Sequence, residues 1–311
     1  MAPTMPGKIA VTPRSLSGAG HPALSLLSER GYEIVYPSPG NLPSEEELLH
    51  SVPGCVGWLA GVEPISPRVL AAAEGLRVIS RNGTGVDNID LDFARSRGIA
   101  VERATGANAR GVAELAITLM LSAFRAVPWS DGQLRKGDWR RRIGVEAQGR
   151  TLAVIGCGAI GREVVDLALG LGMWVVGHDP APSNSFARPG FRFASLREAL
   201  AGADAITLHC PPGERPILDK AMLAQLKRGV AIVNTARAEL IDEEALLAAL
   251  DTGQVGSLAT DVFRREPPEP SPLTAHERVI LTPHVGGFTE ESVERATRVA
   301  VENLLRVLEP R

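Results

Sequence analysis

Short apolar runs alternate with amphipathic stretches along most of the chain, and this alternation is its first structural signal. In the first hundred residues, amphipathic segments such as Ser44–His50 and Ser66–Glu74 separate runs of strand length. The alternation predicts parallel sheets with helices on their faces. The predicted strands are Lys8–Thr12, Glu33–Tyr36, Cys55–Leu59, Arg77–Ser80 and Ile99–Val101.

A long apolar segment, Gly111–Val127, predicts a helix that ends at Pro128, and a polar loop follows as far as Arg150. The same alternation then resumes. Expected strands are Thr151–Ile155, Met173–Gly177, Ala205–His209, Val230–Asn234, Ser257–Thr260 and Val279–Thr282. Expected helices are Leu196–Ala201, Asp219–Leu226, Asp242–Leu250 and the amphipathic Thr289–Leu308.

A glycine-rich turn, GCGAIG at 156–161, follows the strand Thr151–Ile155 and opens a helix-like segment. Gly156 permits the tight turn, Gly158 lets backbone N–H groups approach a pyrophosphate, and Gly161 lets the helix pack close to the sheet. A second strand then ends at Asp179, whose carboxylate can accept hydrogen bonds from both ribose hydroxyls of NAD. The same carboxylate would repel the 2′-phosphate of NADP. An ordinary glycine turn is the alternative, but the strand, helix and terminal acid together favour an NAD site.

The helix after the last strand is free to return to the first half of the chain. We therefore expect an α/β protein with two Rossmann-like or flavodoxin-like parallel-sheet domains. A discontinuous substrate domain would comprise residues 1–104 and 289–311. The NAD-binding Rossmann domain would comprise residues 105–288.

Three polar residues follow predicted strands of the second half: Arg237, Glu266 and His284. Ligands of open parallel sheets bind beyond the carboxyl ends of the strands, so all three are expected near the glycine turn. Histidine can donate a proton to a developing alkoxide, a carboxylate can stabilise its imidazolium, and a guanidinium can bind a substrate carboxylate as a fork. Any one of them alone would more often be a loop residue or a surface ion pair.

Composition and charge narrow the class of protein. The 311 residues are 44% hydrophobic and 22% charged, with a formal net charge of −3, which gives no reason to expect nucleic acid or a membrane surface as partner. No apolar stretch approaches the ~20 residues of a membrane span, and the start lacks a secretory pattern. Three distant cysteines, Cys55, Cys157 and Cys210, fit neither a disulfide framework nor a metal site. A cytoplasmic location is expected.

Several segments together resemble the D-isomer-specific 2-hydroxyacid dehydrogenases, and most closely their phosphoglycerate dehydrogenase branch, in a short form without a C-terminal regulatory domain. The segments run from about residue 80 onward, in the family's order and spacing. They are ISRNGTGVDNID (79–90), GVAELAITLML (111–121), VIGCGAIGRE (154–163), HDP (178–180), VNTARAELIDEEAL (233–246), ATDVFRREP (259–267) and LTPHVGG (281–287).

The resemblance implies an NAD-dependent oxidoreductase that acts on a small 2-hydroxy or 2-keto acid, and a homodimer. It implies that Arg237, Glu266 and His284 are catalytic, with His284 also against the cofactor. It implies that the loop Arg81, Asn82 and Gly83 presents backbone N–H groups to the substrate carboxylate, although an ordinary strand-to-helix turn is the alternative there. The residues implied to lie against the cofactor, besides the three glycines, are Thr84, Ala159, Ile160, Asp179, Cys210, Thr235, Ala236, Asp261 and Gly286.

The substrate stays open at this point. The family usually has glycine after the catalytic arginine, where this chain has Ala238, and the segment WLAGVEPIS (58–66) lacks the arginine that often binds a substrate phosphate. The run Arg140, Arg141 and Arg142 is either a solvated face or a phosphate-binding loop that reaches across a dimer. Hydroxypyruvate, glyoxylate and phosphono-2-keto acids are therefore alternative substrates. An NAD-sensing binding protein, similar to the related corepressors, is the alternative outside the enzyme class.

Overall fold

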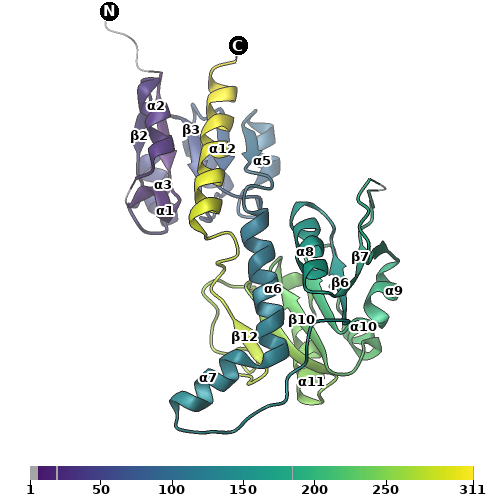
Figure 1. Cartoon of the computed structure of the whole chain (residues 1–311). Helices are drawn as coiled ribbons and strands as arrows, with labels where there is room; N and C mark the ends of the chain where they lie inside the picture. Colours follow the sequence, from purple (N-terminus) through teal and green to yellow (C-terminus); the bar gives the residue numbers. More distant parts are fainter. Residues whose placement is uncertain (1–5, 19, 184, 311) are drawn as a thin grey trace, which may run out of the picture. The chain divides into compact units, whose positions relative to one another are not determined.

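A computed structural model describes residues 6–18, 20–183 and 185–310, and it divides into two compact units (Figure 1). Unit 1 comprises residues 1–108 and 288–311, and unit 2 comprises residues 109–287. The sequence placed these limits at 104 and 289.

Unit 1 is built on a five-stranded parallel sheet with the order β2-β1-β3-β4-β5. One face packs against α12 (Glu290–Leu308), and the other is covered by α3 (Glu45–Ser51), α4 (Pro67–Ala72) and α5 (Leu91–Ser96). The short α1 (Arg14–Ser17), η1 (Pro22–Leu24) and α2 (Ser25–Glu29) lie between β1 and β2. The strands are β1 (Lys8–Val11), β2 (Glu33–Val35), β3 (Cys55–Ala60), β4 (Val78–Arg81) and β5 (Ala100–Arg103).

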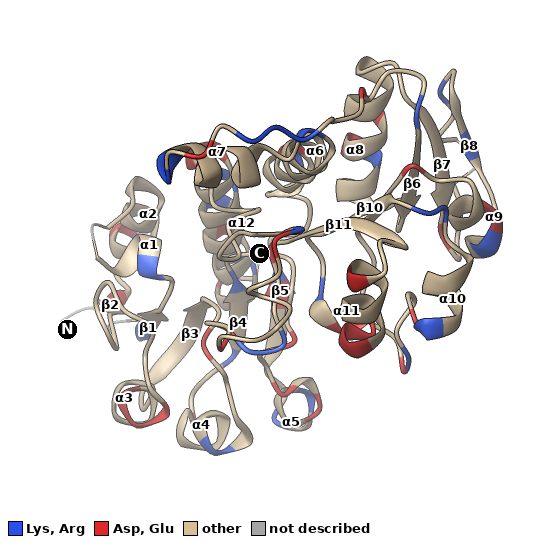
Figure 2. Cartoon of the chain, turned by 90° about the horizontal axis from the view of Figure 1, so that it is seen from below, with Lys and Arg blue, Asp and Glu red and all other residues tan. Residues whose placement is uncertain are grey.

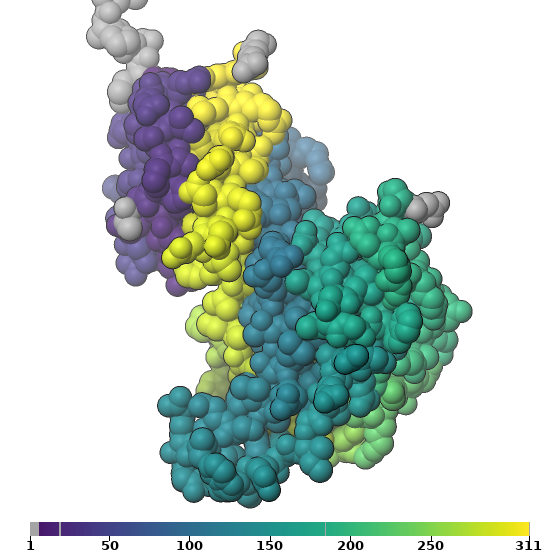
Figure 3. All heavy atoms as spheres, in the orientation of Figure 1, coloured from purple at the N-terminus to yellow at the C-terminus, as the bar shows by residue number. Residues whose placement is uncertain are grey.

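The helix α12 shows why a distant segment belongs to unit 1. Thr289 caps its first turn by accepting a hydrogen bond from the amide of Ser292 at 3.1 Å. Its apolar residues recur at helical spacing, and Ala300, Val301 and Leu304 are fully buried against the sheet. Figure 3 shows this helix in yellow along the earlier segments of the unit. Both faces of the sheet therefore carry a core, and one of them depends on α12.

Unit 2 is built on a seven-stranded parallel sheet with the order β12-β11-β10-β9-β6-β7-β8. Helices α6 (Ala109–Arg125) and α8 (Ala159–Gly170) cover one face, and α9 (Leu196–Ala201), α10 (Lys220–Gln225) and α11 (Glu243–Asp251) cover the other. The strand order reverses at β6, which pairs with β7 on one side and β9 on the other. Such a switch point opens a crevice at the carboxyl ends of the strands. The strands are β6 (Thr151–Ile155), β7 (Trp174–His178), β8 (Phe191–Phe193), β9 (Ala205–Leu208), β10 (Val230–Asn234), β11 (Val255–Thr260) and β12 (Val279–Leu281).

The structure corrects the prediction for the segment after the long apolar helix. That helix, α6, ends at Arg125, Ala126 adopts a left-handed φ of 47°, and a second helix, α7, runs from Val127 to Arg135. Pro128 therefore begins a helix rather than ending one, because a proline in the first turn loses no intrahelical hydrogen bond. In the described part of the chain no single helix is long and apolar enough to cross a membrane. Only α6 and α7 together reach that threshold, and they are bent by 60°.

Candidate active site

The carboxyl ends of the unit 2 strands bring the expected cofactor and catalytic residues to one edge of the sheet. All seven strands are parallel, so the segments that follow β6, β7, β9, β10, β11 and β12 leave from the same side. These segments carry the glycine turn, Asp179, Cys210, Arg237, Asp261 and His284.

The glycine turn has the close approaches that its sequence predicts. Gly156 has a φ of 93°, and a Cβ there would lie 2.7 Å from the backbone of His209. A Cβ at Gly161 would lie 2.0 Å from the carbonyl oxygen of Gly156, so the helix start and the turn are in direct contact. Gly158 caps α8 without a side-chain hydrogen bond and has open space beside its Cα. The N-terminus of α8, which begins with Ala159 and Ile160, can therefore receive a phosphate group, and these residues fit a dinucleotide.

Asp179 follows β7 directly and lies against the same turn. Its Oδ2 accepts a hydrogen bond from the amide of Cys157 at 2.8 Å, and its Oδ1 accepts one from the amide of Ala181 at 2.9 Å. Burial and the Asp179 charge raise the pKa of the Cys157 thiol to about 12, so this thiol stays neutral. Among the described residues no cluster of histidine, cysteine, aspartate or glutamate could hold a metal ion.

His284 and Glu266 form a direct pair. The Nδ1 of His284 lies 2.7 Å from Oε2 of Glu266, and both side chains stay partly exposed. Burial raises the pKa of Glu266. The hydrogen bond and charge of His284, the amide of Phe263 and the charge of Arg237 together lower it by more, so the net pKa of Glu266 is below the usual range. The ionised carboxylate accepts the proton on Nδ1, which leaves Nε2 of the imidazole for proton exchange.

A buried aspartate holds the loop that carries His284. Oδ1 of Asp261 accepts hydrogen bonds from Oγ1 of Thr282 at 2.6 Å and the amide of Val285 at 2.9 Å, and Oδ2 accepts one from the amide of Gly286 at 2.8 Å. Within this loop the backbone of His284 adopts a left-handed φ of 53°, which is uncommon for a residue other than glycine. The resemblance implies that Asp261 and Gly286 lie against the cofactor, which stays a prediction; in the structure the two residues are hydrogen-bonded to each other.

Asn234 holds the loop that carries Arg237, a role that was not predicted from the sequence. Its side-chain amide donates to the carbonyl of Arg237 at 2.8 Å and accepts from the amide of Ala236 at 3.1 Å, while the residue is 1% exposed. The guanidinium of Arg237 donates to the carbonyl of Ala236 at 2.7 Å. The sequence did carry one indication of this role: Asn234 is a polar residue at the end of the otherwise apolar strand VAIVN.

His209 lies behind Thr235 on the neighbouring strand end. Its ring nitrogens lie 2.8 Å from Oγ1 of Thr207 and 3.5 Å from Oγ1 of Thr235. Burial lowers the pKa of His209 to about 3, so the ring is neutral and acts as a packed hydrogen-bonding group. Burial also raises the pKa of the neighbouring Cys210 thiol.

The predicted substrate loop belongs to unit 1 and follows β4. The amide of Asn82 donates to the carbonyl of Ala60 at 2.9 Å, and the amide of Gly83 donates to the carbonyl of Arg81 at 2.8 Å. The hydroxyl of Thr84 donates to the side chain of Asn108 at 3.4 Å. This loop is thus tied to the end of β3.

In the run of three arginines, Arg140 and Arg142 contact other side chains, and Arg141 extends into solvent. Arg140 bonds to Asp138 and Gln133. The guanidinium carbon of Arg142 lies 3.9 Å from the ring centroid of Trp129, and the same side chain pairs with Glu277 at 2.7 Å. Arg141 is exposed to solvent. Figure 2 shows the run in blue on the coil that follows α7.

Comparison with known proteins agrees with this architecture. The family model for the NAD binding domain of D-isomer specific 2-hydroxyacid dehydrogenases matches residues 117–286. The D-3-phosphoglycerate dehydrogenase of Methanocaldococcus jannaschii is 40% identical over 272 residues, which cover 85% of this chain and 52% of that protein. The chain thus spans about half the length of the curated relatives it matches.

Solved structures cover the chain almost completely. The TT0316 protein of Thermus thermophilus is 38% identical with a TM-score of 0.88, over 98% of this chain and 97% of that one. A glyoxylate reductase from Paecilomyes thermophila is 29% identical with a TM-score of 0.86, over 97% of this chain and 95% of that one. By its sequence and by its two-sheet fold, the chain belongs to the D-isomer specific 2-hydroxyacid dehydrogenase family.

Proposed function

We propose that the protein is an NAD-dependent D-2-hydroxyacid dehydrogenase that interconverts a small 2-keto acid and the corresponding 2-hydroxy acid. The observation that carries the proposal is the 2.7 Å contact between His284 and Glu266 at the sheet edge where the glycine turn lies. This pair provides a proton donor beside the crevice that binds dinucleotides in such folds.

The glycine turn and Asp179 of unit 2 support the cofactor part of the proposal. Gly156, Gly158 and Gly161 would leave room for the pyrophosphate at the start of α8, and Asp179, which lies against this turn, would accept hydrogen bonds from the ribose hydroxyls. The bound nicotinamide would supply or accept the hydride at C2 of the substrate. The carboxylate of Asp179 disfavours a 2′-phosphate, which supports NAD over NADP.

Replacing Asp179 with alanine is expected to weaken NADH binding and to relax discrimination against NADPH. An unchanged ratio of the two dissociation constants would contradict this role.

The chain's own residues would handle the proton and the substrate. In the reduction of the keto acid, His284 would start as an imidazolium that Glu266 stabilises, and it would donate the proton on Nε2 to the developing alkoxide, which leaves a neutral imidazole. The guanidinium of Arg237 would bind the substrate carboxylate and polarise the carbonyl. The Arg81–Gly83 loop stays a predicted substrate loop, but in this structure its Asn82 and Gly83 amides donate to the carbonyls of Ala60 and Arg81.

A substitution at His284 tests the proposal. His284→Asn is expected to lower kcat by about 10²- to 10⁴-fold, the usual contribution of a positioned acid–base group, while NADH still binds. Turnover would be followed as NADH oxidation with 3-phosphohydroxypyruvate, hydroxypyruvate, glyoxylate, pyruvate, phosphonopyruvate and 2-ketoglutarate. His50→Asn, at an exposed histidine of α3, is the matched control. Unchanged turnover of His284→Asn would overturn the assignment.

The phosphoglycerate dehydrogenases among the relatives and the glyoxylate reductase among the solved structures point to different substrates. Both lie within the proposed reaction, and the substrate panel separates them.

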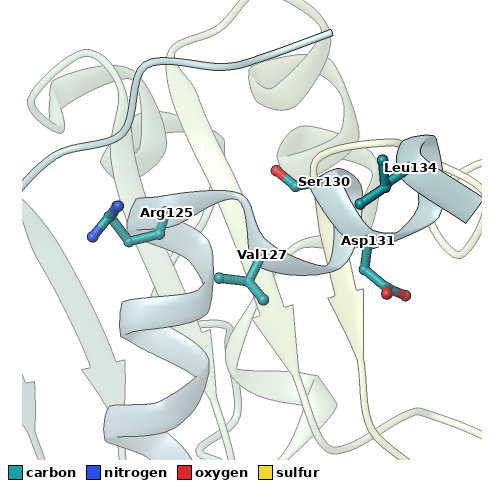
Figure 4. Close-up of a pocket in the computed structure, with 5 residues that line it drawn as sticks. All are labelled: Arg125, Val127, Ser130, Asp131 and Leu134. Carbon is teal, nitrogen blue, oxygen red and sulfur yellow. The ribbon is translucent and has the colours of Figure 1, made fainter. Parts of the chain in front are cut away.

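The exposed apolar residues of α7 and the following segment support a homodimer. Leu134 is 57% exposed, Trp139 is 78% exposed and Ile143 is fully exposed. Figure 3 shows this part projecting from unit 2, and Figure 4 shows a hollow lined from the end of α6 and from α7. Apolar side chains gathered on a projecting segment are typical of a protein interface.

A further inference from the structure

Arg162 lies in the first turn of α8, directly after the last glycine of the glycine turn, and it is bound to both residues that precede the helix. Its amide donates to the carbonyl of Gly158 at 3.1 Å. The Nε of its guanidinium donates to the carbonyl of Cys157, also at 3.1 Å. The partly buried side chain therefore folds back over the turn instead of extending into solvent.

An aromatic ring holds the guanidinium of Arg162 from a second side. The guanidinium carbon lies 5.3 Å from the ring centroid of Phe186, a buried residue of the segment between β7 and β8. The same ring lies 4.6 Å from the guanidinium carbon of Arg188, and Arg188 pairs with Asp166 of α8 at 2.8 Å. Phe186 is itself packed in the core on this face of the sheet. The ring therefore supports the conformation in which Arg162 bonds to the glycine turn.

Arg162 carries its positive charge at the end of a helix that disfavours one. The amide dipoles give a helix N-terminus a partial positive charge, so a cation in the first turn is destabilising unless an anion lies nearby. Within the described part of the chain, no carboxylate forms an ion pair with Arg162. The carboxylate of Asp179, on the same turn, bonds to the amides of Cys157 and Ala181 instead. A pyrophosphate at the start of α8 would balance the charge of Arg162.

The bond from Arg162 also sets the direction of the peptide between Cys157 and Gly158. This peptide is trans, so its carbonyl and its N–H point to opposite sides. Because the guanidinium holds the carbonyl of Cys157, the amide of Gly158 points away from Arg162. Among the residues that the structure describes, none accepts a hydrogen bond from that amide. The same bond occupies a carbonyl oxygen that would otherwise repel a phosphate.

We propose that Arg162 is a positioning residue for the cofactor pyrophosphate. It orients the peptide between Cys157 and Gly158 so that the amide of Gly158 is free for the phosphates, and it supplies a positive charge beside them. The inference rests on the proposed NAD site and deepens it. Because Arg162 acts through the glycine turn and not at the reacting atoms, its removal should weaken the binding of the phosphates rather than slow the chemical step.

Two fragments of the cofactor, 5′-ADP and adenosine, separate the phosphates from the rest of the ligand. Arg162→Met keeps an apolar stem beside Phe186 and removes both the donor and the charge. The Kd of ADP, measured by calorimetry, is expected to rise about tenfold in this variant, the scale of one hydrogen bond to a charged group. The Kd of adenosine, measured by displacement of NADH, should stay the same. In turnover, the change should appear in the KM for NADH more than in kcat. An unchanged Kd of ADP, or an equal rise for ADP and adenosine, would overturn the inference.

Two further variants check the cause of the effect. Arg162→Lys keeps a positive charge and a hydrogen-bond donor, so it should recover most of the affinity for ADP. A Kd of ADP as high as that of Arg162→Met would contradict the roles of the charge and the donor. Arg192→Met, at an exposed arginine of β8, is the matched control and should bind ADP as the natural protein does. Thermal unfolding of all three variants checks that they fold.

Failure of the proposed function gives a different result. A natural protein that binds neither NADH nor ADP would reject the cofactor site, and the role of Arg162 with it. A natural protein that binds both but reduces none of the 2-keto acids would reject the proposed reaction alone. The comparison of ADP with adenosine would then still decide the role of Arg162.

Discussion

At the scale of single residues, Asp261 illustrates how the side chain proposed as the proton donor, His284, is held. Three hydrogen bonds from Thr282, Val285 and Gly286 converge on its carboxylate and fix a loop in which His284 takes a left-handed backbone conformation. A non-glycine residue keeps that conformation only when its surroundings enforce it.

Replacing Asp261 with asparagine is therefore expected to reduce both stability and turnover. The new NH₂ group would face donors, and the mismatch should lower the free energy of unfolding by about 1–3 kcal/mol. Denaturant unfolding measures the stability, and NADH oxidation measures kcat. Asp92→Asn, at an exposed aspartate of α5, is the control. Full activity in Asp261→Asn would show that the loop does not need this support.

Glu63 should make stability depend on pH in the direction opposite to most carboxylates. Its pKa is raised in the folded protein above the ordinary value of 4.5, so between these two values the native state binds more protons than the unfolded state. Stability should then fall as pH rises through this window. Glu63→Gln removes the titrating group, so the difference in Tm between the variant and the natural protein should grow from pH 4 to pH 8. A constant difference would contradict the raised pKa.

The chemistry-bearing residues could be predicted more easily than the residues that hold them. Arg237, Glu266 and His284 lie in the segments that follow the ends of β10, β11 and β12, and topology alone brings these segments to one edge of the sheet. The partners of Asp261 lie more than 20 positions along the chain, and those of Glu63 come from three separate segments. No local pattern encodes such pairings, so they require the folded structure.

At the scale of elements, the start of α8 leaves no room for a side chain at Gly161. Gly161→Ala would place a Cβ 2.0 Å from the carbonyl oxygen of Gly156, so the helix would have to move away from the turn. We expect loss of NADH binding and a marked fall in Tm. Gly170→Ala is the matched control, because it lies in the same helix with open space around it and should stabilise by about 0.5 kcal/mol. NADH binding by Gly161→Ala at the natural affinity would contradict the tight packing.

The junction between α6 and α7 offers a stabilising substitution. Ala126 has a φ of 47°, which costs an L-residue about 1–2 kcal/mol. Ala126→Gly should therefore raise the free energy of unfolding by about 1 kcal/mol, whereas Ala123→Gly inside α6 should lower it by a similar amount. Denaturant unfolding compares the two variants. Loss of stability in Ala126→Gly would mean that the bend is not strained.

Elements with a clear apolar or amphipathic pattern were predicted, whereas β8, α1 and α2 were not. The buried strands β6, β9 and β10 coincide with predicted runs because each of their residues faces protein on both sides of the sheet. The edge strand β8 has three partly exposed residues, and α1 and α2 are only 4 and 5 residues long. Such elements are set by tertiary contacts more than by their own sequence.

At the scale of the whole molecule, the proposed homodimer makes a prediction of its own. Ile143→Asp places a charge at a fully exposed apolar position of the projecting segment. Dissociation to monomers, seen by light scattering, is expected because a buried unpaired carboxylate would destabilise the interface. Arg141→Asp nearby controls for charge alone. A natural protein that is already monomeric at micromolar concentration would reject the dimer.

The discontinuous make-up of unit 1 has a consequence for how the chain is made. The helix that covers one face of its sheet is synthesised only after the 179 residues of unit 2, from 109 to 287. At ribosomal rates of ~5–20 residues per second, the uncovered face waits roughly 10–40 s for its partner. During that interval the apolar surface around Val11, Leu59 and Val78 is open to chaperones or to neighbouring chains. The contiguous unit 2 faces no such delay and can fold while synthesis continues.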